Sequence, residues 1–119
     1  MEISVIPKQR MVLVRPVGEI DHHTSGEIKR VTEKEIRRSG AINIAFDFGR
    51  VSFMDSSGIG MIIGRYKTVT ALGGSVIIYD ATEQIKRIIE MSGLLPLVIL
   101  SDTLQKGINE KNRLKGVKI

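Results

Sequence analysis

The chain has 119 residues, of which 42% are hydrophobic and 26% are charged, as expected for one ordinary globular domain and not for a disordered or fibrous chain. It contains no cysteine, which excludes disulfides, a thiolate nucleophile and a Cys-ligated zinc ion and fits a cytoplasmic protein. No window approaches the roughly 18 apolar residues of a membrane span, and the N-terminus lacks a signal-peptide pattern. We therefore expect neither secretion nor a membrane partner.

The positive charge is concentrated at the C-terminal end of the chain. The net charge is +5, but residues 106–119 alone have a surplus of +4, which leaves +1 for residues 1–105. A basic end after a helix is commonly a solvated terminus, and the aromatic content of 4% offers few stacking surfaces for single strands. We expect no nucleic-acid partner, a domain over 1–105, and the end of a C-terminal helix with a basic tail over 106–119. The basic residues of this tail are Lys106, Lys111, Arg113, Lys115 and Lys118.

The N-terminal part of the chain predicts a β-hairpin followed by a helix. Mainly apolar segments at 3–6 and 11–17 are separated by a short connection that predicts the hairpin loop, and Gly18 ends the second strand. Thr24–Glu27 has the spacing of a capping box and predicts the start of a helix. Ser39-Gly40 predicts its end.

The rest of the chain alternates strands with helices. Residues 41–48 alternate strictly between large apolar residues and smaller or polar ones, which predicts a strand with two unlike faces. Further elements are predicted as a helix after Asp55, a strand over 75–79, a helix from Thr82 to Gly93, a strand over 97–100 and a helix starting at Ser101 or Asp102. The order β-β-α-β-α-β-α-β-α indicates an α/β fold with a largely parallel sheet.

The helix after Asp55 contains three glycines, although each costs about 0.8–1 kcal/mol in a helix interior relative to alanine. A helical wheel places the large apolar residues in one stripe. The opposite face holds Ser57, Gly60, Met61, Gly64 and Thr68. Small residues around a flexible methionine allow a close approach by another backbone. Two interpretations remain: a partner docks on this face, or the protein's own neighbouring helix or loop packs there.

Asp55 and Ser56 stand where a loop meets the first turn of this helix, and either could be its N-cap. The amino end of a helix carries a partial positive charge and unpaired N–H groups, so it tolerates a phosphate. A serine at this place could therefore be phosphorylated without unfolding its domain.

An enzyme is the rival from another class. Asp55, Ser56 or Ser57, and the pair His22 and His23 supply the parts of a hydrolase triad, but the glycine that opens a nucleophile elbow is missing. No metal site is expected, because adjacent histidines point in different directions. The glycine spacing fits no nucleotide-binding motif, so we expect no cofactor of the chain's own.

Four segments together resemble a known family. Gly18–Thr24 (GEIDHHT), Ser52–Gly60 (SFMDSSGIG), Gly64–Lys67 (GRYK) and Met91–Leu94 (MSGL) look like the bacterial anti-sigma-factor antagonists with a STAS domain, and most of all like those of sporulation stage II. The resemblance extends to about Leu104. It implies a mixed, largely parallel sheet of about five strands with packed helices.

In this family the serine after the aspartate, here Ser56, is phosphorylated by the anti-sigma factor, which is itself a serine kinase and brings the ATP. A PP2C-type phosphatase reverses the reaction. The resemblance implies that the unphosphorylated protein binds the anti-sigma factor and frees the sigma factor, most simply in sporulation. The alternative within the family is an antagonist of the general stress response.

The resemblance also implies a docking surface that combines the loop at Asp21 with the start of the glycine-containing helix. We expect phosphorylation to act by local charge and sterics, with Asp21 and Asp55 adding repulsion, and without large backbone movements. The predicted partner-binding residues are Asp21, His22, Asp55, Ser57, Gly58, Gly60, Met61, Gly64 and Arg65.

Overall fold

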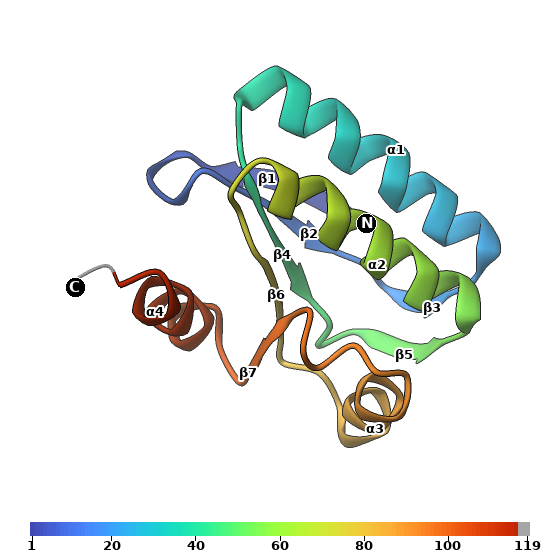
Figure 1. The fold of residues 1–119 in the computed structure, drawn as a ribbon. Helices are drawn as coiled ribbons and strands as arrows, with labels where there is room; N and C mark the ends of the chain where they lie inside the picture. The colour runs from blue at the N-terminus through green and yellow to red at the C-terminus, as the bar shows by residue number, and fades with distance from the viewer. Residues whose placement is uncertain (117–119) are drawn as a thin grey trace.

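The computed structural model describes residues 1–116 and shows a five-stranded sheet with helices on both sides (Figure 1). The strand order is β1-β2-β4-β6-β7. β1 pairs antiparallel with β2, and the other neighbours pair in parallel. The predicted α/β class with a largely parallel sheet is therefore confirmed. The strands are β1 (Glu2–Ile6), β2 (Met11–Arg15), β4 (Asn43–Asp47), β6 (Val76–Tyr79) and β7 (Ile99–Ser101).

A second sheet of two short parallel strands, β3 (Gly18–Ile20) and β5 (Val51–Met54), continues the chain beyond β2 and β4. Neither strand was predicted from the sequence. The second strand of the hairpin was predicted to reach Val17, whereas β2 ends at Arg15. Strands of three or four residues are too short to show a periodic pattern. They are defined by their pairing with each other, which a local stretch of sequence does not show.

The helices cover the sheet unequally. α1 (His22–Ser39) and α2 (Ser56–Ala71) lie side by side on one face, and α4 (Leu104–Leu114) covers the other face. α3 (Glu83–Met91) lies below β5 in Figure 1. The hairpin connection forms a short 3-10 helix, η1 (Pro7–Gln9). α1 follows β3 and α2 follows β5, and these two strands pair in parallel, so α1 and α2 start at the same end of the molecule and run in the same direction.

The alternation predicted for residues 41–48 is confirmed from Asn43 onward, within and just after β4. It is wrong for the two residues before the strand, because Ala41 is buried in the larger cluster and Ile42 is only half-buried. Ile44, Phe46 and Phe48 belong to the larger hydrophobic cluster, which also includes residues of α1 and α2, and all three are fully buried. Ala45 belongs to the smaller cluster with Ile108 of α4. Burial of each large apolar side chain contributes roughly 1.5–3 kcal/mol, so the two faces of β4 fix helices on both sides of the sheet.

The helix caps correct two predictions. The capping box at Thr24 is wrong, because α1 begins at His22 and Asp21 is its N-cap, with Asp21 Oδ1 accepting a hydrogen bond from Thr24 N (2.9 Å). The N-cap of α4 is Thr103, not Ser101 or Asp102. The predicted Thr82 cap of α3 is confirmed. Gly40 ends α1 as predicted, in a left-handed conformation with φ of 72°.

The basic C-terminal end is largely helical. α4 continues to Leu114, and the expectation of a solvated terminus is wrong for Lys111, which is buried and whose pKa is lowered by that burial. Lys118 lies outside the described residues, and the division at residue 105 stays a prediction.

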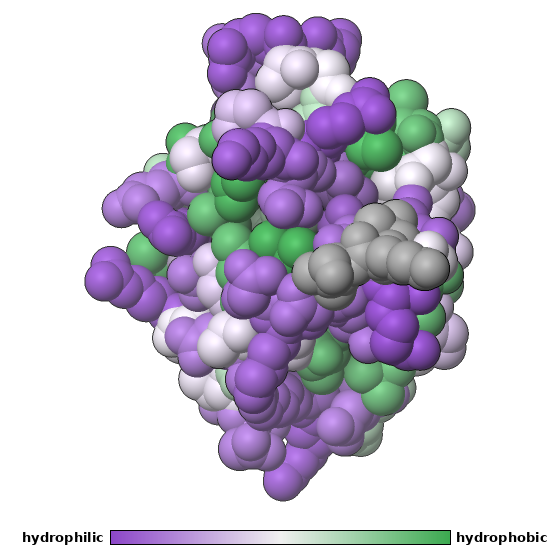
Figure 2. All heavy atoms as spheres, turned by 90° about the vertical axis from the view of Figure 1, so that its left-hand side faces the viewer, coloured by the Kyte–Doolittle hydropathy of each residue, from purple (hydrophilic) through white to green (hydrophobic). Residues whose placement is uncertain are grey.

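Figure 2 shows the side of the molecule on which α4 lies: hydrophilic side chains cover most of it, and hydrophobic ones are exposed only in small patches. Such scattered exposure is ordinary for a protein surface.

Candidate functional site

The β3–β5 pair places the first turns of α1 and α2 beside each other (Figure 1). Ile20, the last residue of β3, is the register partner of Met54, the last residue of β5. The backbone N–H of Asp55 donates to the carbonyl oxygen of Ile20 (3.3 Å). Paired strands lie about 4.8 Å apart, so the next residues, Asp21 and Asp55, are neighbours. Two of the four segments that carry the family resemblance, distant in sequence, thus meet at one place.

Asp55 is the N-cap of α2, which decides between the two candidates for that position. Its Oδ1 accepts hydrogen bonds from Ser57 N (2.8 Å) and Gly58 N (3.3 Å). Ser56 is then the first residue of the helix, and it is exposed. We expected the unpaired N–H groups at the start of this helix to accommodate a phosphate on Ser56. The cap corrects that expectation, because the Asp55 carboxylate already accepts hydrogen bonds from two of these N–H groups.

Asp21 performs the same role for α1 and keeps its negative charge at the surface. The hydrogen bond from Thr24 N is the main cause that lowers the pKa of Asp21 below its ordinary value. His22 and His23 follow it and are exposed. Ser56 therefore belongs to one of two neighbouring helix starts, each of which already carries a capping carboxylate.

The three glycines of α2 have different explanations. A Cβ on Gly58 would overlap the side chain of Met54 and lie 3.1 Å from Cγ2 of Ile20, so the protein's own packing requires a glycine there. A Cβ on Gly60 or Gly64 would meet no atom within 4 Å. The interpretation by internal packing thus holds for Gly58 alone. Gly60 and Gly64 leave open space that nothing in the described chain fills.

The expectation that Met61 is an exposed part of this face is wrong. Met61 is 7% exposed and belongs to the larger core cluster. Arg65 is 3% exposed and bonds to residues of α1. The wheel treated α2 as resting on a single layer, whereas α1 also covers its flank. A partner that binds the folded chain as described would not reach these two side chains.

The part of the predicted surface that remains accessible is called the two-helix face below. Asp21, His22, Ser56 and Gly60 are exposed, and Ser57 and Gly64 are half-buried. The two-helix face comprises Asp21, His22, Ser56, Ser57, Gly60 and Gly64. It contains the Asp21 carboxylate at the start of α1, an exposed hydroxyl and a smooth strip of helix. Asp55 is half-buried as well, but its Oδ1 is already engaged as the cap of α2. This arrangement suits recognition by another protein better than chemistry on a small molecule.

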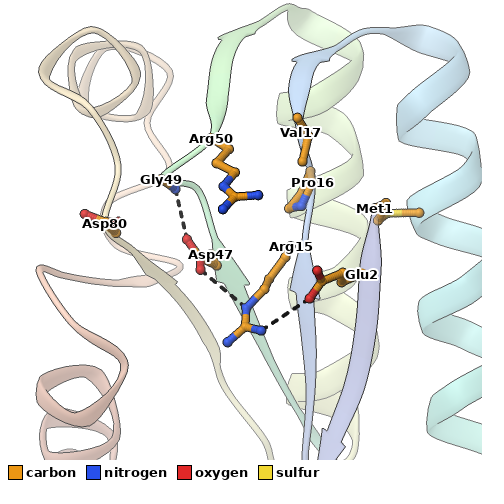
Figure 3. Close-up of a pocket in the computed structure, with 9 residues that line it drawn as sticks. All are labelled: Met1, Glu2, Arg15, Pro16, Val17, Asp47, Gly49, Arg50 and Asp80. Atoms are coloured by element: carbon orange, nitrogen blue, oxygen red, sulfur yellow. Dashed lines mark hydrogen bonds and ion pairs between the residues drawn. The ribbon is translucent and has the colours of Figure 1, made fainter.

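The cavities lie elsewhere. One of about 540 Å³ opens at the carboxyl ends of β2, β4 and β6 (Figure 3). There the Arg15 guanidinium lies 3.4 Å from Glu2 Oε2 and 3.5 Å from Asp47 Oδ2, so neighbouring carboxylates neutralise it. A second, of about 530 Å³, lies between β7 and α4. Neither is lined by the serines and histidines proposed for a hydrolase, Ser56, Ser57, His22 and His23.

Within residues 1–116, no group of three or more His, Asp or Glu side chains is placed to hold a metal ion. The helices of this part of the chain are too short or too polar to cross a membrane.

Comparison with known proteins identifies the family. The sequence profile of the STAS domain matches residues 2–107, so the chain belongs to the STAS domain family.

The relatives are antagonists of anti-sigma factors. An anti-sigma F factor antagonist of Paenibacillus polymyxa is 32% identical over 110 residues, which cover 92% of this chain and 94% of the relative. An anti-sigma-B factor antagonist of Listeria monocytogenes is 27% identical, covering 82% and 88%. The structure of the Bacillus cell fate determinant SpoIIAA in the phosphorylated form superimposes with a TM-score of 0.70 at 28% identity, covering 92% of this chain and 96% of that one.

Proposed function

We propose that the chain is an anti-sigma-factor antagonist that binds its anti-sigma factor through the two-helix face and is switched off by phosphorylation of Ser56. The observation that carries the proposal is the exposed Ser56 at the start of α2, directly after the cap Asp55, where the β3–β5 pair brings the start of α1 close. The relative at 32% identity is an anti-sigma F factor antagonist. SpoIIAA, at 28% identity, exists in a phosphorylated form.

The open space above Gly60 and Gly64 supports docking on this face. A helix without side chains at these positions lets the backbone of a partner approach closely. Asp21 and His22, at the start of α1, extend the surface beyond α2. Asp55, Gly58, Met61 and Arg65 act indirectly in this proposal, because they cap α2 or hold it in place.

Phosphorylation acts by charge in this proposal. The phosphate adds about −1.5 to −2 charges next to two carboxylates, and Asp55 already occupies the nearest free N–H groups. A charge left unpaired in an interface costs roughly 2–5 kcal/mol, which corresponds to about 30-fold to several thousand-fold in affinity. Because Ser56 is already exposed, no rearrangement of the fold is needed.

The chemistry is supplied by partners. The anti-sigma factor is the serine kinase and brings ATP, a PP2C-type phosphatase removes the phosphate, and the chain itself is a regulator and not an enzyme. It acts in the cytoplasm, where sigma factors are used. Sporulation is the process favoured by the relative at 32% identity.

The direct experiment mixes the chain with purified anti-sigma F factor of Paenibacillus polymyxa and ATP, and maps phosphate by mass spectrometry. We expect one phosphate, on Ser56, and none on the Ser56→Ala variant. Phosphate on Ser57, or on neither serine, contradicts the site. Incubation of the chain alone with activated esters tests the hydrolase alternative, and we expect no turnover.

The similarity to an anti-sigma-B factor antagonist supports a second candidate partner. Titration of the chain with purified anti-sigma F and anti-sigma-B factors separates the two. Tighter binding to the anti-sigma-B factor would move the proposal from sporulation to the general stress response.

A further inference from the structure

A buried arginine joins the two helices that carry the two-helix face. The Nη1 atom of Arg65, on α2, donates to the carbonyl oxygen of Lys29 (3.2 Å) and to Thr32 Oγ1 (3.4 Å) on α1. Its Nη2 lies 3.4 Å from Glu33 Oε1. All three acceptors belong to little more than one turn of α1, so a single side chain of α2 contacts α1 at one height along its axis.

Stability alone does not explain a guanidinium at this place. Arg65 Nε is buried and has no hydrogen-bond partner among the described residues, and Glu33, its only ionic partner there, is partly exposed. Replacing a buried ion pair by apolar side chains of similar volume is often neutral or stabilising, whereas directional polar contacts can specify one register between two helices. Apolar contacts, such as those of Ile28 and Met61 in the core, are less directional.

The position of Arg65 along α2 lets it influence how the two helix starts are placed relative to each other. The β3–β5 pair already fixes the two helices at their N-terminal ends. Arg65 lies nine residues after Ser56, which is about 14 Å further along α2 at 1.5 Å per residue. Two attachment points separated along the axis determine both the spacing and the orientation of the helices.

We infer that Arg65 is a positioning residue: it locks α1 against α2 in one register and so presents Asp21 and His22 together with Ser56 as one surface. The locking follows from the contacts of Arg65 alone. Its consequence for partner recognition rests on the proposed function.

The test uses spin labels on the full chain, which has no native cysteine to interfere. Cysteines replace the exposed residues Arg30 on α1 and Lys67 on α2, and pulsed EPR measures the distance distribution between the labels. In an Arg65→Met background we expect a broader distribution, or a mean displaced by about 1.5 Å or more, the rise of one residue. The melting temperature should be equal to or higher than that of the unsubstituted chain.

Arg38→Met is the matched control, because Arg38 is an exposed arginine of α1 whose carboxylate partner, Glu35, lies in the same helix (2.6 Å). It should leave the distribution unchanged. A distribution in Arg65→Met identical to that of the control would overturn the inference. Arg65→Lys, which keeps the charge and loses the planar fork, should broaden the distribution less. It replaces Arg65→Met in the comparison if that variant does not fold.

Binding of purified anti-sigma F factor supplies the second readout. If Arg65 positions the surface, Asp21→Ala should weaken binding in the native background and have a clearly smaller effect in Arg65→Met, with a coupling of about threefold or more. Equal effects in both backgrounds contradict the link between register and recognition. Absence of binding by the unsubstituted chain would instead count against the proposed function, and the EPR result would stand by itself.

Discussion

Gly60→Ala separates the effect on docking from the effect on folding. A Cβ at Gly60 would meet nothing within 4 Å, and the residue lies in the interior of α2 at an exposed position. Alanine is favoured over glycine there by about 0.8–1 kcal/mol. For a domain of this size that gain corresponds to a rise in Tm of about 4 °C.

Partner binding should change in the opposite direction. If another backbone lies against Gly60, the added methyl group overpacks the interface, at a cost of about 1–3 kcal/mol, or roughly 5-fold to 150-fold in Kd. Thermal unfolding followed by circular dichroism, and titration calorimetry with the anti-sigma factor, measure the two effects on the same sample.

Thr70→Ala is the control, since it also raises helix propensity and is exposed near the far end of α2. It should stabilise the chain and leave Kd unchanged. A Gly60→Ala variant that binds as tightly as the unsubstituted chain would refute the assignment of Gly60 to the docking surface.

Three further predictions concern the same end of the molecule. Ser56→Asp should change the free energy of unfolding by less than about 1 kcal/mol, because the side chain is exposed, and should abolish anti-sigma factor binding; retention of binding would remove the electrostatic argument. Gly58→Ala should destabilise the chain by about 1–3 kcal/mol in urea unfolding, because its Cβ would overlap Met54; unchanged stability would contradict the packing. Asp21→Asn should destabilise the chain at neutral pH. The pKa of Asp21 is lowered in the folded chain, so the carboxylate contributes stability above its ordinary pKa of 3.8, and the difference between variant and native chain should shrink as the pH falls below that value; a difference independent of pH would show that the charge has no role.

Local patterns predicted the main sheet, and long-range pairing explains what they missed. The alternation along β4 and the Thr82 cap are encoded within a few neighbouring residues, and both are confirmed. β3 and β5 have three and four residues and exist because Ile20 pairs with Met54. No window of the sequence contains both partners. The same pairing ends β3 at Ile20 and so makes Asp21, instead of Thr24, the cap of α1.

In the candidate site, too, features encoded by neighbouring residues were predicted, and features set by contacts between distant segments were missed. Ser56, Gly60 and the loop at Asp21 were identified from their residue types and from the family resemblance, and they lie at one end of the molecule. Met61 was misassigned, because a helical wheel describes one helix and cannot show that α1 lies against its flank. The contacts of Arg65 with α1 were missed for the same reason: nothing near Arg65 in the sequence indicates that Lys29 and Glu33 are its partners.

The central claim is that one hydroxyl at the tip of α2 controls binding. The most direct test is the Kd for anti-sigma F factor of the same preparation before and after enzymatic phosphorylation, with the Ser56→Ala variant treated in parallel. We expect a loss of affinity of at least about 30-fold on phosphorylation and no change for Ser56→Ala. Equal affinities of the phosphorylated and unphosphorylated chains would contradict it.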